Sequence, residues 1–302
     1  MNIAILSRGP QLYSTQSLFR AGIKRGHHVQ IIDHTRCDLL VEKNFVEVYY
    51  ENLPLEHLDA IIPRIGASVT NQGAALINHL ELMNIFSVAR PNALLQSRDK
   101  LRTLQKLSRF GIDIPKTVFV NSTANLGRMV EELGGFPIVV KLLEGTHGIG
   151  VILSENISNA EATIEAFHRM KEQVLIQEFI REAEGADIRV IVVDGQVVAA
   201  MKRQARPGEF RSNLHRGASS ELVKLTAREE HVAKKAVRIM GLDVAGIDLL
   251  RSSRGPLVME VNASPGLEGI ETTTGIDVSG KIFDFIEKKV RKKSRDHRRV
   301  RR

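Results

Sequence analysis

Short apolar runs alternate with amphipathic segments along the first part of the chain, and this alternation is its clearest structural signal. Runs of strand length lie at residues 3–6, 29–32, 60–62 and 86–89, and residues 71–83 have the spacing of an amphipathic helix. Strands separated by helices predict a parallel sheet with helices on its faces.

Two arginines stand in the loops that follow the first and third of these strands. The carboxyl ends of parallel strands meet at one edge of a sheet, where open α/β sheets place their ligands. Arg8 and Arg64 would lie at that edge and are candidates to hold a substrate carboxylate, although solvent-facing positions explain single loop arginines equally well. No Gly-x-Gly-x-x-Gly follows the first strand, so a dinucleotide cofactor is not indicated.

After residue 96 the pattern becomes the mixture of strands and helices that is typical of α+β units. We expect a boundary near residues 91–96, with Ser97 as the N-cap of a helix that ends at Gly111. Ser158 and Glu161 have the spacing of a capping box. The other predicted elements are strands at 137–143, 151–153 and 174–180, a hairpin of 187–193 and 196–201, and a helix at 227–240.

A hairpin near the carboxyl end, GIDLLRSSRGPLVMEVNASPG, carries the main candidate chemistry on strands 244–250 and 257–261. Asp248 and Glu260 each interrupt an apolar strand, and Glu260 and Asn262 point to one face because side chains alternate. Two carboxylates and an amide oxygen suit Mg²⁺ or Mn²⁺, which usually bind together with substrate phosphates. A carboxylate is costly to bury unpaired, so a bound cation is the expected partner of Asp248. Ordinary surface positions are the alternative.

A nucleotide phosphate site is predicted at the strand 137–143 and the loop that follows it. Lys141 is the one cation in this apolar strand, and a buried lysine needs an anion. Residues 144–150, EGTHGIG, place three glycines between two strands, which suits a flexible cover whose N–H groups approach phosphate oxygens. A plain hairpin turn uses similar residues. A Walker loop is excluded because no Gly-Lys-Ser/Thr follows.

Further polar groups are expected around the same site. The end of the strand 174–180 would form a hinge whose backbone reads an adenine edge and whose carboxylate holds ribose hydroxyls. Cations and amides opposite the metal ligands would stabilise the charge on a transferring phosphoryl group, although a solvated loop explains the segment 209–218 by itself. The residues concerned are Asp187, Arg189, Lys202, Arg203 and Arg211-Ser212-Asn213.

Composition narrows the class of protein. The 302 residues, 43% apolar and 26% charged, are enough for two or three folded domains, and no apolar run reaches the length of a membrane span. The single Cys37 fits a reducing cytoplasm and is expected to be structural, and no secretory signal is expected at the amino terminus.

The net charge of +8 is a property of the tail. Residues 288–302 hold ten Lys/Arg and one Asp, whereas the remaining chain holds 33 basic and 34 acidic residues. Such a block of like charge is disordered or extends a terminal helix, and it can also contact RNA phosphates. The sequence does not separate these two interpretations.

Five ordered motifs give the chain a family resemblance. They are VVKLLEGTHGIGV, LIQEFI, DIRVIVVDGQVVAAMKRQA, FRSNLHRG and AGIDLLRSSRGPLVMEVNASPGLEGIE, and with IPRIG and SRDKLR they extend to about Thr274. The chain resembles ATP-grasp enzymes, and most closely the RimK-type α-L-glutamate ligases that modify a small-subunit ribosomal protein. The basic tail departs from the pattern of this family and leaves partner specificity open.

The resemblance implies a fold, an activity and a set of site residues. The fold would be ATP-grasp, α/β and α+β, with an amino-terminal α/β domain at 1–95, a central lobe at 96–184, a carboxyl-terminal lobe at 185–287 and the tail at 288–302. ATP would contact Lys100, Lys141, Glu178, Phe179, Asp187 and Arg211-Ser212-Asn213. Two Mg²⁺ or Mn²⁺ ions would bind Asp248, Glu260 and Asn262. Arg203 and Lys141 would be catalytic. Family members are cytoplasmic and often tetrameric.

The expected reaction joins a carboxylate to an amine. The carboxyl terminus of an acceptor protein would attack the γ-phosphate of ATP, and the amine of glutamate would displace phosphate from the acyl phosphate. Two alternatives are a ligase that adds an amino acid to a small molecule, and a ribosome- or RNA-binding factor that uses ATP as a switch.

Overall fold

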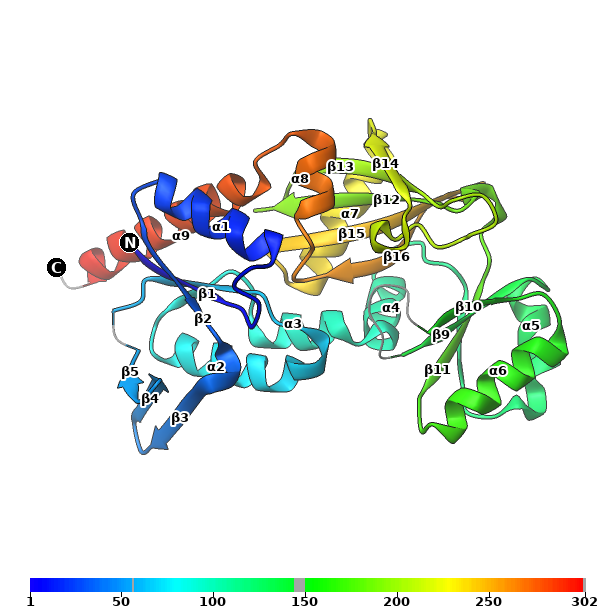
Figure 1. The fold of residues 1–302 in the computed structure, drawn as a ribbon, viewed down its shortest axis with the longest axis horizontal. Helices are drawn as coiled ribbons and strands as arrows, with labels where there is room; N and C mark the ends of the chain where they lie inside the picture. The colour runs from blue at the N-terminus through cyan, green and yellow to red at the C-terminus, as the bar shows by residue number, and fades with distance from the viewer. Residues whose placement is uncertain (56, 144–149, 301–302) are drawn as a thin grey trace.

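The computed structural model describes residues 1–55, 57–143 and 150–300, with side chains through residue 292. This part of the chain forms four sheets, with helices packed on them (Figure 1). No helix in it is long and apolar enough to cross a membrane.

The amino-terminal sheet has the order β2-β1-β6-β7, and all its strands are parallel, as predicted. Its strands are β1 Asn2–Leu6, β2 His28–Ile32, β6 Ala60–Pro63 and β7 Phe86–Ser87. The amphipathic segments between them form α1 Tyr13–Lys24 and α2 Thr70–Leu82. The carboxyl edge of this sheet therefore holds the loops after β1, β2 and β6.

A small antiparallel sheet between β2 and β6 was not predicted. It consists of β3 Cys37–Glu42, β4 Phe45–Tyr50 and β5 Leu53–Pro54. Asn44 takes a left-handed φ of 63° in the turn between the first two strands. The pattern is hard to recognise because most of β3 is exposed on both faces, so polar and apolar residues do not alternate.

Two helices, α3 Pro91–Arg98 and α4 Lys100–Arg109, occupy the predicted boundary. The expectation that Ser97 caps a helix is wrong, because Ser97 lies inside α3 and donates to Leu94 O. Asp99 is the N-cap of α4, and its carboxylate accepts from the N–H of Arg102 at 2.9 Å. The shorter side chain of serine offers the same chemistry, so the sequence pattern alone cannot choose between the two residues.

The central sheet has the order β10-β9-β11-β8 and its own hydrophobic core. Its elements are β8 Thr117–Val120, β9 Ile138–Leu142, β10 Val151–Ser154, β11 Val174–Glu178, α5 Leu126–Leu133 and α6 Ile157–Arg169. The predicted capping box at Ser158 and Glu161 is wrong. Asn156 caps α6 instead, by accepting from the N–H of Asn159.

The carboxyl-terminal sheet is antiparallel, in the order β14-β13-β12-β15-β16. Its strands are β12 Ala186–Val193, β13 Gln196–Gln204, β14 Ser219–Leu222, β15 Val244–Ser252 and β16 Gly255–Asn262. The helices here are α7 Ala227–Met240, α8 Glu268–Thr274 and α9 Val278–Val300. β15 and β16 extend further than predicted and meet in a turn at Ser253 and Arg254.

The amino-terminal and carboxyl-terminal sheets share their cores. One cluster joins Leu6 and Ile61 to Val190 and Val261, and another joins Ile5 and Leu18 to residues of α9. Figure 1 shows α9 lying beside α1, so the last helix covers the first sheet. The predicted domain boundaries at residues 95, 184 and 287 stay a prediction. The shared cores join the first and last sheets, and the central sheet has a core of its own.

Candidate active site

A row of charged side chains crosses one face of the carboxyl-terminal sheet. Arg189 on β12 is the direct partner of Asp248 on β15, and Asp248 is the direct partner of Glu260 on β16. Opposed residues of antiparallel strands share a face, and Asn262 shares it too, two positions beyond Glu260. The structure therefore brings the three predicted metal ligands together on two neighbouring strands.

Asp248 is buried and already has cationic partners. Arg189 donates to both of its oxygens at 2.7 and 2.6 Å, and Arg203 donates to Oδ2 at 2.9 Å. Burial favours the neutral carboxyl group, but these two guanidinium groups hold the pKa of Asp248 well below its usual range. Two arginines therefore already supply the partner that burial of Asp248 requires, and metal binding at Asp248 stays a prediction.

Arg203 is fixed between two carboxylates. Besides Asp248, it binds Asp187 with Nε and Nη2, in the bidentate arrangement that suits a guanidinium. Burial and the nearby Asp248 raise the pKa of Asp187, whereas the two carboxylates raise that of Arg203 despite its burial. Both side chains are buried, so the Arg203 guanidinium has a single well-defined position.

Glu260 and Asn262 complete an oxygen donor set that fits a hard divalent ion. Glu260 is exposed, and no hydrogen bond or ion pair with another described residue occupies its carboxylate. The Oδ1 of Asn262 accepts from the N–H of Ser264 at 2.9 Å, which orients it and leaves its second lone pair available. Within the described part of the chain, no group of three or more His, Cys, Asp and Glu side chains could hold a metal. A metal site here therefore depends on the amide as well as the two carboxylates.

Lys141 extends from β9 toward the same region. Its Nζ donates to Oε1 of Gln177 on β11 at 2.5 Å. The pKa of Lys141 is lowered to about 8, mainly by burial and also by the charge of Lys100, while the charge of Glu260 acts in the opposite direction. Lys100, at the start of α4, donates from Nζ to Leu143 O at 2.8 Å. Lys141 therefore has a neutral partner in the protein, and its charge is available to an anionic ligand.

The predicted hinge residues lie at the end of β11. The Glu178 carboxylate accepts from the N–H of Lys116 at 2.6 Å and pairs with Arg254, so it is held by the protein itself. Phe179 packs edge-on against Phe210, with ring centroids 6.2 Å apart. This contact connects the hinge to the polar loop 209–218.

Within that loop, Arg211 is bound by Glu209 at 2.9 and 2.7 Å and also donates to Val151 O in the central sheet at 3.2 Å. The bonds from Arg211 lower the pKa of Glu209 to about 2. Ser212 is buried, and Asn213 precedes a short 3-10 turn at Leu214–Arg216. The loop therefore bridges the two sheets.

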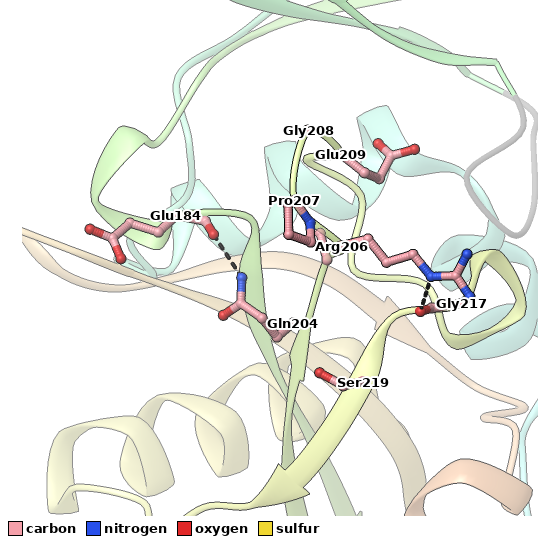
Figure 2. A pocket seen from close by; sticks show the side chains of 9 residues that line it. Glu184, Gln204, Arg206, Pro207, Gly208, Glu209, Gly217 and Ser219 are labelled. Carbon is pink, nitrogen blue, oxygen red and sulfur yellow. Dashed lines mark hydrogen bonds between the residues drawn. The ribbon is translucent and has the colours of Figure 1, made fainter.

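A cavity of about 500 Å³ lies under this loop (Figure 2). Figure 2 shows Arg206 donating to Gly217 O and Gln204 donating to Glu184 O on its walls. None of the predicted site residues lines it. Glu209 lines it and also binds Arg211, so the cavity adjoins the candidate site without being part of it.

The glycine-rich segment predicted to cover the phosphates, residues 144–149, lies outside the described residues.

Cys37 is half-buried at the start of β3, and burial raises its pKa to about 11, so little thiolate forms at neutral pH. This fits the prediction that Cys37 is structural.

Arg189 was expected only as one of the cations opposite the metal ligands, not as the partner of Asp248, and Gln177 had no predicted role. Arg189 was identifiable in principle, because it stands two positions after Asp187 on a strand and so shares its face. Gln177 gives no such signal, since only the pairing of β9 with β11 places it beside Lys141.

The chain matches known protein families over nearly its whole length. Residues 97–286 match the RimK-like ATP-grasp domain family, and residues 1–94 match the RimK PreATP-grasp domain family. A probable alpha-L-glutamate ligase of Hahella chejuensis is 55% identical over 293 residues, which is 97% of each chain.

Two solved structures have the same fold. A RimK domain ATP-grasp protein from Sphaerobacter thermophilus has a TM-score of 0.70 and 23% identity, over 95% of this chain and 99% of that one. The ATP-grasp ligase PsnB, complexed with a phosphomimetic variant of its minimal precursor, Mg and ADP, has a TM-score of 0.71 and 19% identity, over 94% and 97%. The predicted ATP-grasp fold is thereby confirmed.

Proposed function

The chain belongs to the RimK-like ATP-grasp family of ATP-dependent ligases, and from that premise we propose that it adds glutamate to the carboxyl terminus of a protein. The proposed acceptor is a small-subunit ribosomal protein. One observation carries the proposal: the Arg189–Asp248–Glu260 row puts oxygen donors for a cation next to fixed guanidinium groups, on a face toward which Lys141 extends.

The proposed reaction has two steps. An oxygen of the acceptor carboxylate attacks the γ-phosphorus of ATP, the bond from that phosphorus to the ADP oxygen breaks, and an acyl phosphate forms. The glutamate amine then attacks the acyl carbon, phosphate leaves with the C–O electron pair, and the amine loses its proton. The product is a peptide whose new terminus is again a carboxylate, so the reaction can repeat.

The residues divide this work according to their charge. Lys141 holds the polyphosphate, and Arg203 stabilises the negative charge on the transferring phosphoryl group and on the tetrahedral intermediate. Because Asp187 and Asp248 fix Arg203 on two sides, its charge is oriented before the substrate binds. Two Mg²⁺ or Mn²⁺ ions on Asp248, Glu260 and Asn262 would supply charge neutralisation at the phosphate oxygens.

The nucleotide base is assigned to the hinge. In this proposal the backbone at Glu178 and Phe179 reads the adenine edge. The ribose and the polyphosphate contact the remaining residues predicted for ATP, namely Lys100, Asp187 and Arg211-Ser212-Asn213. Arg211 supports this assignment because it already joins the loop to the central sheet.

The proposal also includes the setting in which the enzyme works. We place it in the cytoplasm, as a tetramer, with the basic tail contacting ribosomal RNA. The tail continues the α9 helix, and Lys288 and Lys289 pair with Asp194, so the tail leaves the body from a fixed point.

The direct test incubates the purified protein with ATP, labelled glutamate and a total ribosomal protein fraction. We expect one small-subunit protein to gain mass in glutamate increments, with one ADP released per increment. The matched control is Glu260→Gln, which we expect to give neither. Glutamate added only to a small molecule would favour the alternative acceptor class, and ADP release independent of glutamate would contradict the ligase function.

A further inference from the structure

Two arginines at the carboxyl edge of the amino-terminal sheet form no ion pair with a carboxylate among the described residues. Arg64 directly follows β6, and its N–H donates to Leu6 O at 2.9 Å, which fixes it beside the end of β1. Arg98, the last residue of α3, donates from Nη2 to Ile65 O at 2.5 Å. Across the described residues, no carboxylate forms an ion pair with either guanidinium group. Their charges are close enough to act on each other.

The surroundings make this arrangement costly. Nε of Arg98 is buried and has no hydrogen-bond partner among the described residues. Burial and the charge of the neighbouring Arg98 together lower the pKa of Arg64 to about 10. Two partly desolvated cations side by side favour a bound anion, and no described carboxylate pairs with them, which points to an anionic ligand.

The pair lies next to the candidate metal site. Pro63 O, one residue before Arg64, accepts from Oγ of Ser264 at 3.3 Å, and the N–H of Ser264 donates to Oδ1 of Asn262. The charge of Glu260 also acts on Arg98. An anion bound by the two arginines would therefore lie beside the phosphoryl-transfer site, on its amino-terminal side.

The second step of the proposed reaction indicates which anion binds to Arg64 and Arg98. The acceptor carboxylate is converted to the acyl phosphate, so it no longer carries the charge that the arginines require. The attacking amine belongs to an acidic amino acid, whose two carboxylates lie only a few bonds from the reacting nitrogen. Resting on the proposed ligase function, we propose that Arg64 and Arg98 bind the carboxylates of the incoming acidic amino acid and so determine its selection.

The test compares Arg64→Gln and Arg98→Lys with the control Arg109→Gln, which removes an exposed charge from the end of α4. The substrates are ATP, glutamate and a synthetic peptide ending in glutamate. Loss of one charge-assisted hydrogen bond predicts a rise of roughly 10- to 100-fold in KM for glutamate in Arg64→Gln, with KM for ATP within about twofold of wild type. Arg98→Lys keeps the charge and is expected to show a smaller rise.

A second readout does not need glutamate. Hydroxylamine can attack the acyl phosphate in place of the amine, giving a hydroxamate and phosphate, and it has no carboxylate to bind. Arg64→Gln is expected to make hydroxamate at the wild-type rate. Because no side-chain hydrogen bond to another described residue is lost in Arg64→Gln, thermal unfolding is expected to match wild type.

The outcomes separate the two proposals. If the wild-type protein made neither hydroxamate nor peptide, the proposed ligase function itself would be contradicted. A wild type that makes both, together with an Arg64→Gln variant whose KM for glutamate is unchanged, would overturn the subsite alone. If Arg64→Gln raised KM for ATP and left KM for glutamate unchanged, the subsite would also be overturned, because the bound anion would then be the nucleotide phosphate.

Discussion

At the scale of single residues, two carboxylates in one row have different surroundings. Asp248 is 3% exposed and accepts hydrogen bonds from two arginines, whereas Glu260 is exposed and has no such partner among the described residues. Replacing Asp248 therefore disturbs a buried network, and replacing Glu260 does not. The two positions can separate a structural contribution from a functional one.

We expect Glu260→Gln to lose at least about 100-fold in ligation rate with little change in the free energy of unfolding. Asp248→Asn removes the carboxylate that Arg189 and Arg203 share, so we expect the same loss of activity together with a destabilisation of about 3–5 kcal/mol. Urea unfolding and ADP release measure the two quantities. Equal stability of the two variants would contradict the assigned difference.

The pH dependence of ATP use is expected to follow Lys141. Its pKa is lowered to about 8, mainly by burial, so the free enzyme loses this positive charge as the pH rises through 8. At saturating glutamate, kcat/KM for ATP is expected to fall above pH 8, because this parameter reports ionisations of the free enzyme. Lys141→Arg keeps its charge, and its profile is expected to stay flat up to pH 9.5. A fall at the same pH in both proteins would assign the ionisation elsewhere.

At the scale of helices and strands, the helix α9 is held against α1 by close packing at a glycine. A Cβ on Gly22 would lie 2.5 Å from Val29 and 2.6 Å from the ring of Phe283, which is fully buried. The bare Cα of Gly22 therefore allows the last helix to reach the first one. Gly127 in α5 is the opposite case, since a Cβ there meets nothing within 4 Å.

Gly22→Ala is accordingly expected to destabilise the protein by about 1–3 kcal/mol through overpacking. The same substitution at Gly127 is expected to be neutral or to stabilise by up to about 1 kcal/mol, because alanine favours a helix over glycine. Thermal unfolding of both variants measures the difference. A stabilised Gly22→Ala protein would mean that the two helices can move apart at no cost.

How far the sequence predicts these elements depends on the signal each one carries. The helix Ala227–Met240 begins and ends where predicted, because Thr226 and Glu229 form a capping box and Gly241 takes the left-handed conformation after it. The strands β3 to β5 have no comparable signal. For the site, alternation along β16 places Glu260 and Asn262 together. The pairing of Asp248 with Arg189 depends on strand order, which local sequence does not encode.

At the scale of the whole molecule, the shared cores join the two ends of the chain into one body. The central sheet has a separate core and meets that body through limited contacts, such as the bond from Arg211 to Val151 O. Lys141 belongs to the central sheet, and the row around Asp248 belongs to the joined body. The candidate active site is therefore assembled from groups on both.

The packing of α9 on α1 also has a consequence for the time course of synthesis. The ribosome makes β1 and α1 long before α9, which packs beside α1 and begins only at Val278. At roughly 5–20 residues per second, the apolar surface that α9 covers stays exposed for on the order of 15–50 seconds. During that interval the nascent chain exposes apolar surface that chaperones can bind, and this part of the core forms only after α9 is made.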